Sequence, residues 1–564
     1  MMGGRFRVAS ALTYGALALT ACAPQRPQTA PVPVMAPPVT VTAQAPTAPS
    51  AATPAAAVSA PRTTYRSAPA DWHLLDPAAD GVAGVGARRA FTELLGNAAP
   101  KRMITVAVID GGVDTANTSL RAALVLNAKE SPANGRDDDG NGYVDDARGW
   151  NFIGGANGNI DDEQLEVTRL VVICRAANGK SPIETPCATL EREYQSGLAE
   201  VTSQWEGLRP VLTEYDGLLD IVAKDRGVPR SAITDVTLKG VAPTSAAARD
   251  ALLKLTMFAA NGLTPNVSRA ARKQVEARLT VGYNLTVDGR KVVGDTPAMG
   301  RRYGNANVTG PDASHGTAVA SVIAAVRGDS GFVGIAPGVR ILPVRVVPNG
   351  DETDKDVANG IRYAVDAGAQ IVNMSFGKPY SPGKAVVDSA VQYAVSKGVL
   401  LVHAAGNEST DVDLTPTYPS ATYAGSRGRA ATWIDVGASG WRADDKLAAG
   451  FTNYGSTTVD LFAPGVQVFA AAPGSTFARE DGTSIAAPVV SGVAALLMSQ
   501  FPTLTAADVK RILMATVTKF PGQQVLRPGG RQATVPFASL STAGGIVNAY
   551  EAVKMAQRET GKAP

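Results

Sequence analysis

The sequence predicts an α/β protein in which helices cover both faces of a parallel sheet, with a helical subdomain inserted into it. Short apolar runs, typical of buried parallel strands, alternate with helical patterns. The apolar runs lie at residues 105–109, 340–347, 370–374, 399–403 and 434–438. The helical patterns lie at residues 317–326, 354–367, 382–397, 484–499, 505–516 and 545–556. Such an alternation places the strands side by side in one sheet with helices on its two faces.

The chain begins with a pattern typical of an exported protein. Arg5 and Arg7 precede an apolar run at 8–21, which is too short to span a bilayer but suits a signal peptide. The run ends in Leu19-Thr20-Ala21-Cys22, which resembles the bacterial lipobox, whose cysteine is lipidated after cleavage. We therefore expect a signal peptide at 1–21 and a lipid anchor on Cys22, in the outer membrane facing the periplasm or the surface. The alternative is an ordinary signal peptide with a chance cysteine.

The segment after Cys22 predicts a tether. Residues 22–70 are rich in Pro and Ala and nearly free of charge. Proline fixes the backbone and removes hydrogen-bond donors, so this stretch is expected to be extended and disordered. Residues 71–100 follow as a short ordered lead-in that docks on the main domain, with a helix near 87–95.

A segment of roughly 200 residues separates Asp110 from His315, far more than a connection within a compact α/β unit requires. We therefore predict a main domain formed by 101–163 and 310–558, interrupted by a helical insertion at 164–309.

Within the insertion, apolar residues from Leu190 to Val222 recur every three or four positions. They predict a long amphipathic helix, disturbed at Pro210. Shorter helices are expected at 245–260 and 267–279. The insertion either packs on itself and on the main domain, which we favour, or forms a lid, an exosite or a dimer contact.

The chain has three cysteines, an odd number for an exported protein. If Cys22 carries lipid, Cys174 and Cys187 remain to form a disulfide in an oxidising compartment. Two free buried thiols are the alternative. A net charge of +3 with 18% charged residues gives no reason to expect nucleic-acid binding. The oligomeric state is left open.

Three motifs carry the chemistry. Ser484 follows Gly482-Thr483 where a loop becomes a long apolar helix, and His315 opens another helix in Ser314-His315-Gly316-Thr317. Asp110 ends an apolar strand. A serine hydroxyl is a poor nucleophile unless a base activates it, and a carboxylate orients that base. The order Asp, His, Ser along the chain is one of the known orders of a catalytic triad.

These motifs resemble those of the subtilisin-like serine proteases, over about residues 101–556 apart from the insertion. The resemblance implies that Asn407, after Ala404-Ala405-Gly406, donates to an oxyanion, and that Ser375-Phe376-Gly377 pairs with substrate. It implies a serine endopeptidase that cleaves proteins or peptides through an acyl-enzyme.

Two residues depart from the family pattern, Gly111 after the aspartate and Ala318 in the His-Gly-Thr motif. Together with the insertion they motivate the alternative of a catalytically weak binding or scaffold protein.

An acidic loop at 137–146 predicts structural calcium. Its alternate oxygen-bearing residues fit the first nine positions of a calcium loop: Asp137, Asp139, Asn141, Tyr143 through its carbonyl, and Asp145. Arg148 stands where the bidentate glutamate would be, so a ligand must be borrowed, with Asp146 or Asp161 as candidates. The alternative is a solvated acidic turn. Zinc is not expected, since the loop has no His or Cys.

Overall fold

A computed structural model describes residues 65–96, 99–131, 133–295, 300–326, 333–426 and 428–561. The predicted signal peptide, Cys22 and the tether up to residue 64 lie outside the described residues. The centre is a nine-stranded sheet with the order β12-β15-β9-β8-β7-β6-β1-β5-β2. Its pairs are parallel except β12 with β15. Its strands are β1 (Thr105–Asp110), β2 (Trp150–Asn151), β5 (Arg340–Arg345), β6 (Ile371–Met374), β7 (Leu400–Ala404), β8 (Trp433–Ser439), β9 (Leu461–Pro464), β12 (Thr518–Lys519) and β15 (Gly545–Ile546).

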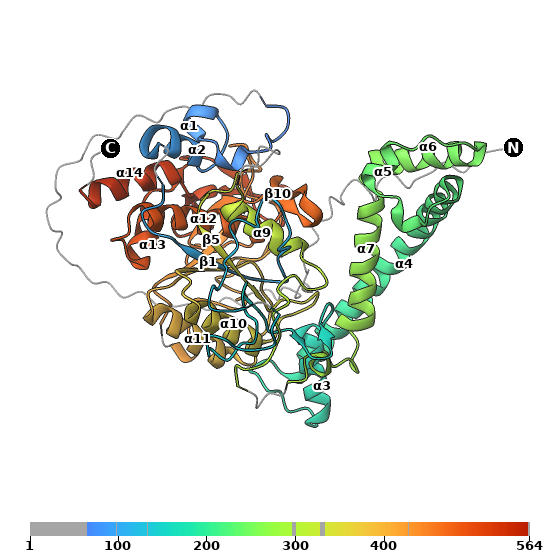
Figure 1. The fold of residues 1–564 in the computed structure, drawn as a ribbon, viewed down its shortest axis with the longest axis horizontal. Coiled ribbons are helices and arrows are strands. Elements are labelled where there is room, and N and C mark those ends of the chain that lie inside the picture. The colour runs from blue at the N-terminus through green and yellow to red at the C-terminus, as the bar shows by residue number, and fades with distance from the viewer. Residues whose placement is uncertain are drawn as a thin grey trace, which may run out of the picture.

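Helices cover both faces of this sheet (Figure 1). One face carries α9 (Ser314–Ala324), α12 (Thr483–Gln500), α13 (Ala506–Ala515) and α14 (Ala549–Glu559). The other carries α10 (Asp354–Asp366) and α11 (Lys384–Ser396). Alternate residues of β1 enter the two cores: Val106 and Val108 join the first, and Ala107 and Ile109 join the second. The predicted α/β fold is confirmed, because strands buried on both faces need the continuous apolar runs that the sequence contains.

The longest helix of the first face, α12, is buried along its whole length. Among the described residues it is the one helix long and apolar enough to cross a membrane. Since all of it lies inside the protein, its composition is explained by its place in the core.

The insertion forms a helical arm. Its helices are α3 (Glu166–Ala176), α4 (Cys187–Arg226), α5 (Asp235–Lys239), α6 (Ala246–Ala260), α7 (Pro265–Ala277) and α8 (Arg290–Val293). The long helices α4 and α7 project from the body, with α5 and α6 at the far end (Figure 1). That end has its own apolar core, which includes Leu212, Tyr215 and Leu255. Pro210, where a disturbance was expected, does not interrupt α4, because the helix of 40 residues contains this proline and continues on both sides of it.

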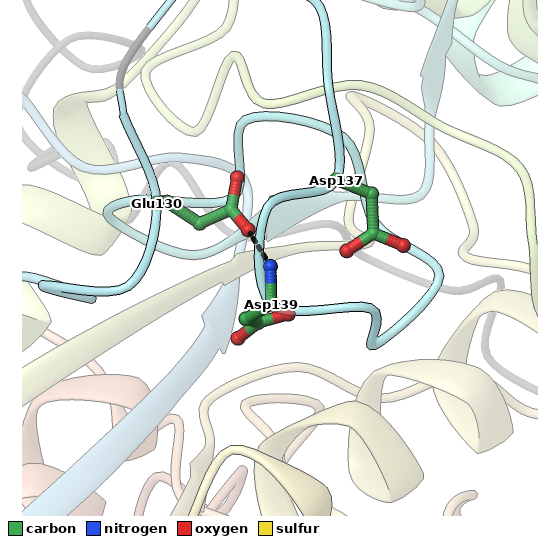
Figure 2. Close-up of side chains that lie close together, drawn as sticks. All are labelled: Glu130, Asp137 and Asp139. Atoms are coloured by element: carbon green, nitrogen blue, oxygen red, sulfur yellow. Dashed lines mark hydrogen bonds between the residues drawn. The ribbon is translucent and has the colours of Figure 1, made fainter.

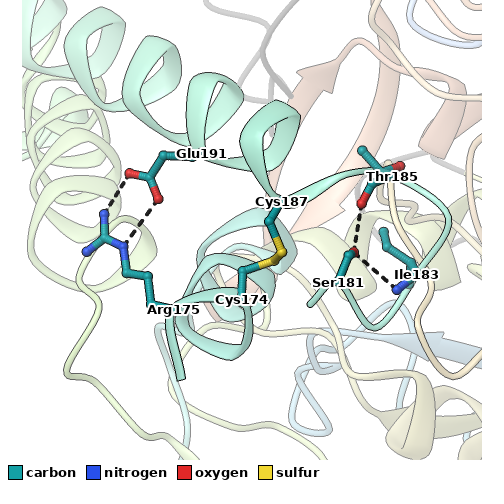
Figure 3. The surroundings of a disulfide bond; sticks show 7 residues. All are labelled: Cys174, Arg175, Ser181, Ile183, Thr185, Cys187 and Glu191. Carbon is teal, nitrogen blue, oxygen red and sulfur yellow. Dashed lines mark hydrogen bonds and ion pairs between the residues drawn. A yellow bond between two sulfur atoms is a disulfide. The ribbon is translucent and has the colours of Figure 1, made fainter. Parts of the chain in front are cut away.

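The base of the arm is cross-linked. Cys174 near the end of α3 and Cys187 at the start of α4 form a disulfide (Figure 3). Beside it, Arg175 and Glu191 form an ion pair of 2.7 Å between the same two helices. The disulfide and the ion pair thus connect α3 to the first turns of α4.

The lead-in docks on the main domain through short helices, η1 (Trp72–Leu74), α1 (Pro77–Asp80), α2 (Ala87–Arg89) and η2 (Ala90–Leu95). Trp72 is fully buried, and its Nε1 donates to the carbonyl of Gln467. The remaining strands form hairpins: β3 (Gly154–Gly155) with β4 (Gly158–Asn159), β10 (Val468–Ala472) with β11 (Thr476–Glu480), and β13 (Gln524–Leu526) with β14 (Thr534–Pro536). Short helical turns are η3 (Arg230–Ala232), η4 (Arg278–Gly282), η5 (Ala424–Ser426), η6 (Pro473–Ser475) and η7 (Phe537–Leu540).

Candidate active site

Asp110 and His315 are brought together at the carboxyl end of β1. His315 Nδ1 lies 2.8 Å from Oδ1 and 3.0 Å from Oδ2 of Asp110, which is itself 2% exposed. Gly316 allows this approach, because an ideal Cβ there would lie 2.2 Å from the carbonyl oxygen of Gly112. A carboxylate can only accept, so Nδ1 carries the proton and Nε2 is left as the basic nitrogen.

The protonation of His315 is tuned by its neighbours. Desolvation lowers the pKa of His315, but the charge of Asp110 and the hydrogen bond to it outweigh this effect and raise the pKa above its ordinary value. The charges of Glu480 and Asp312 act in the same direction. The imidazole can therefore accept a proton readily, as a general base must.

Ser484 lies at the start of α12, and α12 packs against α9, the helix that His315 opens. Gly482 makes room for the serine, because an ideal Cβ at Gly482 would lie 2.7 Å from Ser484 Oγ. Glu480, four residues before the serine, is close enough to His315 for their charges to interact. The N-terminus of a helix favours negative charge, which suits a developing oxyanion beside this serine.

Asn407 is oriented by the residue that precedes the serine. Its Oδ1 accepts hydrogen bonds from the backbone N–H of Thr483 (2.9 Å) and from the Thr483 hydroxyl (3.0 Å). This fixes which end of the amide is oxygen and leaves Nδ2 as the outward donor. Nδ2 lies 3.9 Å from the ideal Cβ position of Gly482, the same point that is 2.7 Å from Ser484 Oγ. The amide nitrogen and the hydroxyl therefore both lie close to this point.

The segment 375–377 continues from β6 and is tied to the serine. The Ser375 hydroxyl donates to the backbone carbonyl of Ser484 (2.8 Å) and accepts from Asn373 Nδ2 (2.9 Å). Ala404 and Ala405, at the end of β7, are buried, and Gly406 donates its N–H to the Thr483 hydroxyl. The residues that the sequence marked as substrate-binding thus lie at the carboxyl ends of β6 and β7, beside the serine.

The alternation of backbone groups shows which edge of the segment 375–377 is left without a strand partner among the residues that the structure describes. Lys378 and Tyr418 exchange two backbone hydrogen bonds of 2.9 Å, and the carbonyl of Phe376 accepts from His403 Nε2 at 3.0 Å. In extended chain, successive residues direct their backbone groups to opposite edges. Ser375 and Gly377 therefore direct theirs to the other edge, where an extended peptide can pair with them.

The acidic loop gathers carboxylates, though not all of those predicted. Carboxylate oxygens of Glu130, Asp137 and Asp139 lie within 4.8 Å of one another (Figure 2). Glu130 Oε1 accepts the N–H of Asp139, and Glu130 is only 5% exposed. Within the described part of the chain, Glu130 Oε2 has no hydrogen-bond partner. An orphaned buried oxygen beside two more carboxylates fits a hard cation such as calcium.

The other predicted ligands take different partners. The carboxylate of Asp145 accepts the N–H groups of Asn134 and Gly135 and is outside this group. Asn141 uses its Oδ1 to accept the N–H of Tyr143. The carboxylate that lies close to Asp137 and Asp139 is that of Glu130, while Asp146 and Asp161 are outside this group. Sequence reasoning missed Glu130 because it precedes the alternating pattern, and a lone Glu in a polar loop gives no signal.

Comparison with known proteins identifies the family of the chain. The profile of the Subtilase family matches residues 101–531, well over half of the chain. The chain is 34% identical to subtilisin DY of Bacillus licheniformis, over 40% of this chain and 77% of that protein. It is 38% identical to thermitase of Thermoactinomyces vulgaris, over 43% of this chain and 75% of that protein. For some other subtilisins the match spans 51% of the relative.

Among solved structures, a protease from Pseudoalteromonas arctica is 29% identical over 44% of this chain and 73% of its own, with a TM-score of 0.35. The match of the family profile over most of the chain, together with the identity to subtilisin DY and thermitase, decides the assignment. The chain belongs to the subtilase family and is a subtilisin-like serine endopeptidase, whose substrates are proteins.

Proposed function

We propose that the chain hydrolyses peptide bonds through an acyl-enzyme on Ser484. His315 Nε2 takes the proton of the Ser484 hydroxyl as Oγ attacks the scissile carbonyl, and Asp110 stabilises the resulting imidazolium. The same proton then passes to the leaving amine. Water, activated by His315, next attacks the ester carbonyl and releases the acid product. The observation that carries this proposal is the contact of 2.8 Å between His315 Nδ1 and Asp110.

The oxyanion in each step is stabilised by two donors. These are Asn407 Nδ2 and the backbone N–H of Ser484, at the positive end of α12. Removing one such donor typically costs about 3 kcal/mol of transition-state stabilisation. The proposal is supported by the way Thr483 fixes the amide of Asn407.

Substrate recognition is proposed to be mainly through backbone. An extended peptide adds as a strand to the edge formed by Ser375 and Gly377, and the Ala404–Gly406 turn borders its other side. Backbone pairing of this kind selects for extended, accessible chain rather than for one sequence.

The proposal is tested by turnover of unstructured casein with the wild type, Ser484→Ala and Ser396→Ala. Ser396 is an exposed serine at the end of α11 and serves as the matched control. We expect casein cleavage by the wild type and the control, and no detectable cleavage by Ser484→Ala with the same thermal melt. A folded wild type that leaves casein intact would support the alternative of a scaffold protein. Equal cleavage by Ser484→Ala would refute the role of this serine.

We also infer that Glu130, Asp137 and Asp139 hold a structural calcium ion. The support is the orphaned oxygen of Glu130 and the crowding of three carboxylates, which repel one another unless a cation is present. The loop lies between β1 and the insertion, so an ion there would brace the segment that follows the catalytic aspartate. It supplies no step of the hydrolysis.

We further propose that the protein is held to a bacterial envelope by lipid on Cys22, after removal of residues 1–21. The support is the lipobox resemblance and the proline-rich segment that follows it. One acyl chain holds a protein only marginally, so stable attachment requires several chains on this cysteine. Cys22→Ala should move the protein to the soluble fraction. A variant that still sediments with membranes after a salt wash would contradict the anchor.

A further inference from the structure

A buried histidine next to the active site takes no part in the proposed chemistry. His403, on β7, is 1% exposed and is the register partner of Met374 on β6 and of Asp435 on β8. Its Nδ1 lies 2.9 Å from Asp435 Oδ1, and its Nε2 lies 3.0 Å from the carbonyl oxygen of Phe376. One side chain therefore links β8 to the segment 375–377.

Both ring nitrogens of His403 face atoms that accept hydrogen bonds. The Phe376 carbonyl can only accept. Asp435 also accepts from Trp433 Nε1 (2.9 Å) and from Arg429 (3.1 Å). A ring lone pair turned toward the Phe376 carbonyl would be costly in a buried site. The contact of 3.0 Å at Nε2 therefore fits an N–H that donates to this carbonyl.

The partner of Nδ1, Asp435, belongs to a network of charged side chains. Arg429 lies 3.1 Å from Asp435 and 3.2 Å from Asp460, which directly precedes β9, and Lys510 of α13 lies 3.2 Å from Asp460. Trp433 lies beside the imidazole at a centroid distance of 5.3 Å. The network holds Asp435 in place, and Asp435 in turn holds the ring.

The carbonyl of Phe376 and the N–H of Gly377 belong to the same planar peptide group. Holding the carbonyl therefore sets the direction of that N–H, which points to the opposite edge, where substrate is proposed to pair. A hydrogen bond donated to the carbonyl also polarises the group and strengthens its N–H as a donor. Gly377 is close to the histidine, since an ideal Cβ there would lie 3.8 Å from His403 Nε2.

We propose that His403 is a positioning residue for substrate binding: it orients and polarises the Phe376–Gly377 peptide so that the Gly377 N–H meets the backbone of an extended peptide. This inference rests on the proposed function, in which the edge at Ser375 and Gly377 receives substrate. The group recognised is a backbone carbonyl of the substrate, since an N–H can only donate. Substrates too short to reach this edge gain nothing from it.

The test compares His403→Leu, which is similar in size and has no donor, with His403→Gln, which keeps an N–H for the Phe376 carbonyl. Each variant is assayed with a tetrapeptide p-nitroanilide, with a single-residue ester, and for its rate of labelling by a small fluorophosphonate. We expect kcat/KM for the tetrapeptide to fall about tenfold or more in His403→Leu, mainly through KM, and less in His403→Gln. Ester hydrolysis and labelling should stay within about twofold of the wild type.

Each other outcome is decisive. Equal losses on the tetrapeptide, the ester and the labelling rate would mean that His403 supports the whole site, and would overturn the positioning role. An unchanged tetrapeptide KM in both variants would overturn it as well. If His403→Leu does not give a wild-type melting curve, His403→Gln is compared with Asp435→Asn instead. We then expect the larger loss of kcat/KM for the tetrapeptide in Asp435→Asn. Wild-type protein that neither labels nor cleaves would instead refute the proposed function.

Discussion

Lys378→Met should destabilise the junction between the insertion and the segment 375–377, which is proposed to bind substrate. The Lys378 side chain is 1% exposed, and its Nζ lies 2.7 Å from Glu166 at the start of α3 and 3.0 Å from Asp354 at the start of α10. It also donates to the carbonyl of Glu352 at 2.7 Å. The variant would leave two buried carboxylates without this cation.

The size of the stability loss depends on which partners the two carboxylates keep in the variant. Removing one partner of a buried ion pair costs about 3–5 kcal/mol. Arg169 still bonds Glu166 at 2.7 Å, so the lower end, about 3 kcal/mol, applies. With about 2–4 °C of melting temperature for each kcal/mol in a large domain, Tm should fall by about 6–12 °C.

Acid stability supplies a second readout. Burial raises the pKa of Glu166, but the charges of Arg169 and Lys378 outweigh it and lower the pKa to about 2. A depressed carboxyl pKa stabilises the fold above the unfolded value near 4.5, and this contribution is lost as pH falls toward about 2. In Lys378→Met the pKa of Glu166 rises, so the contribution is smaller and is lost at higher pH.

The assay is scanning calorimetry in a Ser484→Ala background, which prevents self-cleavage. Lys254→Met removes an exposed ion pair of 3.1 Å on the arm and is the matched control, with no measurable change expected. The double variant Lys378→Met/Asp354→Asn should recover much of the lost stability, because Glu166 keeps Arg169 at 2.7 Å and neither carboxylate is then left without a cation. A single variant that melts within about 2 °C of its parent, or a double variant no better than the single, would refute the reasoning.

Three further predictions concern the triad, the acidic loop and the disulfide. Asp110→Asn should lower kcat by about 10⁴, as in other enzymes with this triad. In the wild type, kcat/KM should decrease as the pH is lowered through the pKa of His315, which is raised above 6.5, because the protonated imidazole cannot act as a base. A loss of activity that begins only below pH 6.5 would contradict the assigned base. Calcium at a hundredfold excess over its Kd should add about 2.7 kcal/mol of stability, and Glu130→Gln should abolish the effect of chelators; equal sensitivity in the variant would exclude Glu130 as a ligand. Replacing Cys174 and Cys187, which are 13 residues apart, by serine should cost about 3 kcal/mol by loop entropy and speed limited proteolysis at the base of the arm, and unchanged cleavage there would contradict this.

Much of the fold could be predicted because its signals are local. The runs that became β1, β5, β6, β7 and β8 are continuously apolar since both faces of a parallel sheet are covered. The catalytic motifs were found for a similar reason, since each combines a chemical group with glycines that the local geometry requires. Gly482 and Gly316 have close contacts that a side chain would break.

The remaining features depend on pairing across the fold. His403 and Asp435 are polar residues in two otherwise apolar strands, and that anomaly is visible in the sequence, but only the register shows that they are partners. Lys378 and Glu166 are separated by the whole insertion, and Glu130 precedes the pattern that marks the acidic loop. Pro210 was expected to disturb α4, yet the packing of its far half in the core of the arm keeps the helix continuous.

The central claim is that Ser484 is the nucleophile, and the most direct measurement is the site of covalent modification. The wild-type protein would be treated with a fluorophosphonate, digested, and mapped by mass spectrometry. We expect one adduct, on the peptide containing Ser484, formed more slowly in Asp110→Asn. No adduct on the folded protein, or an adduct on a different residue, would contradict the mechanism.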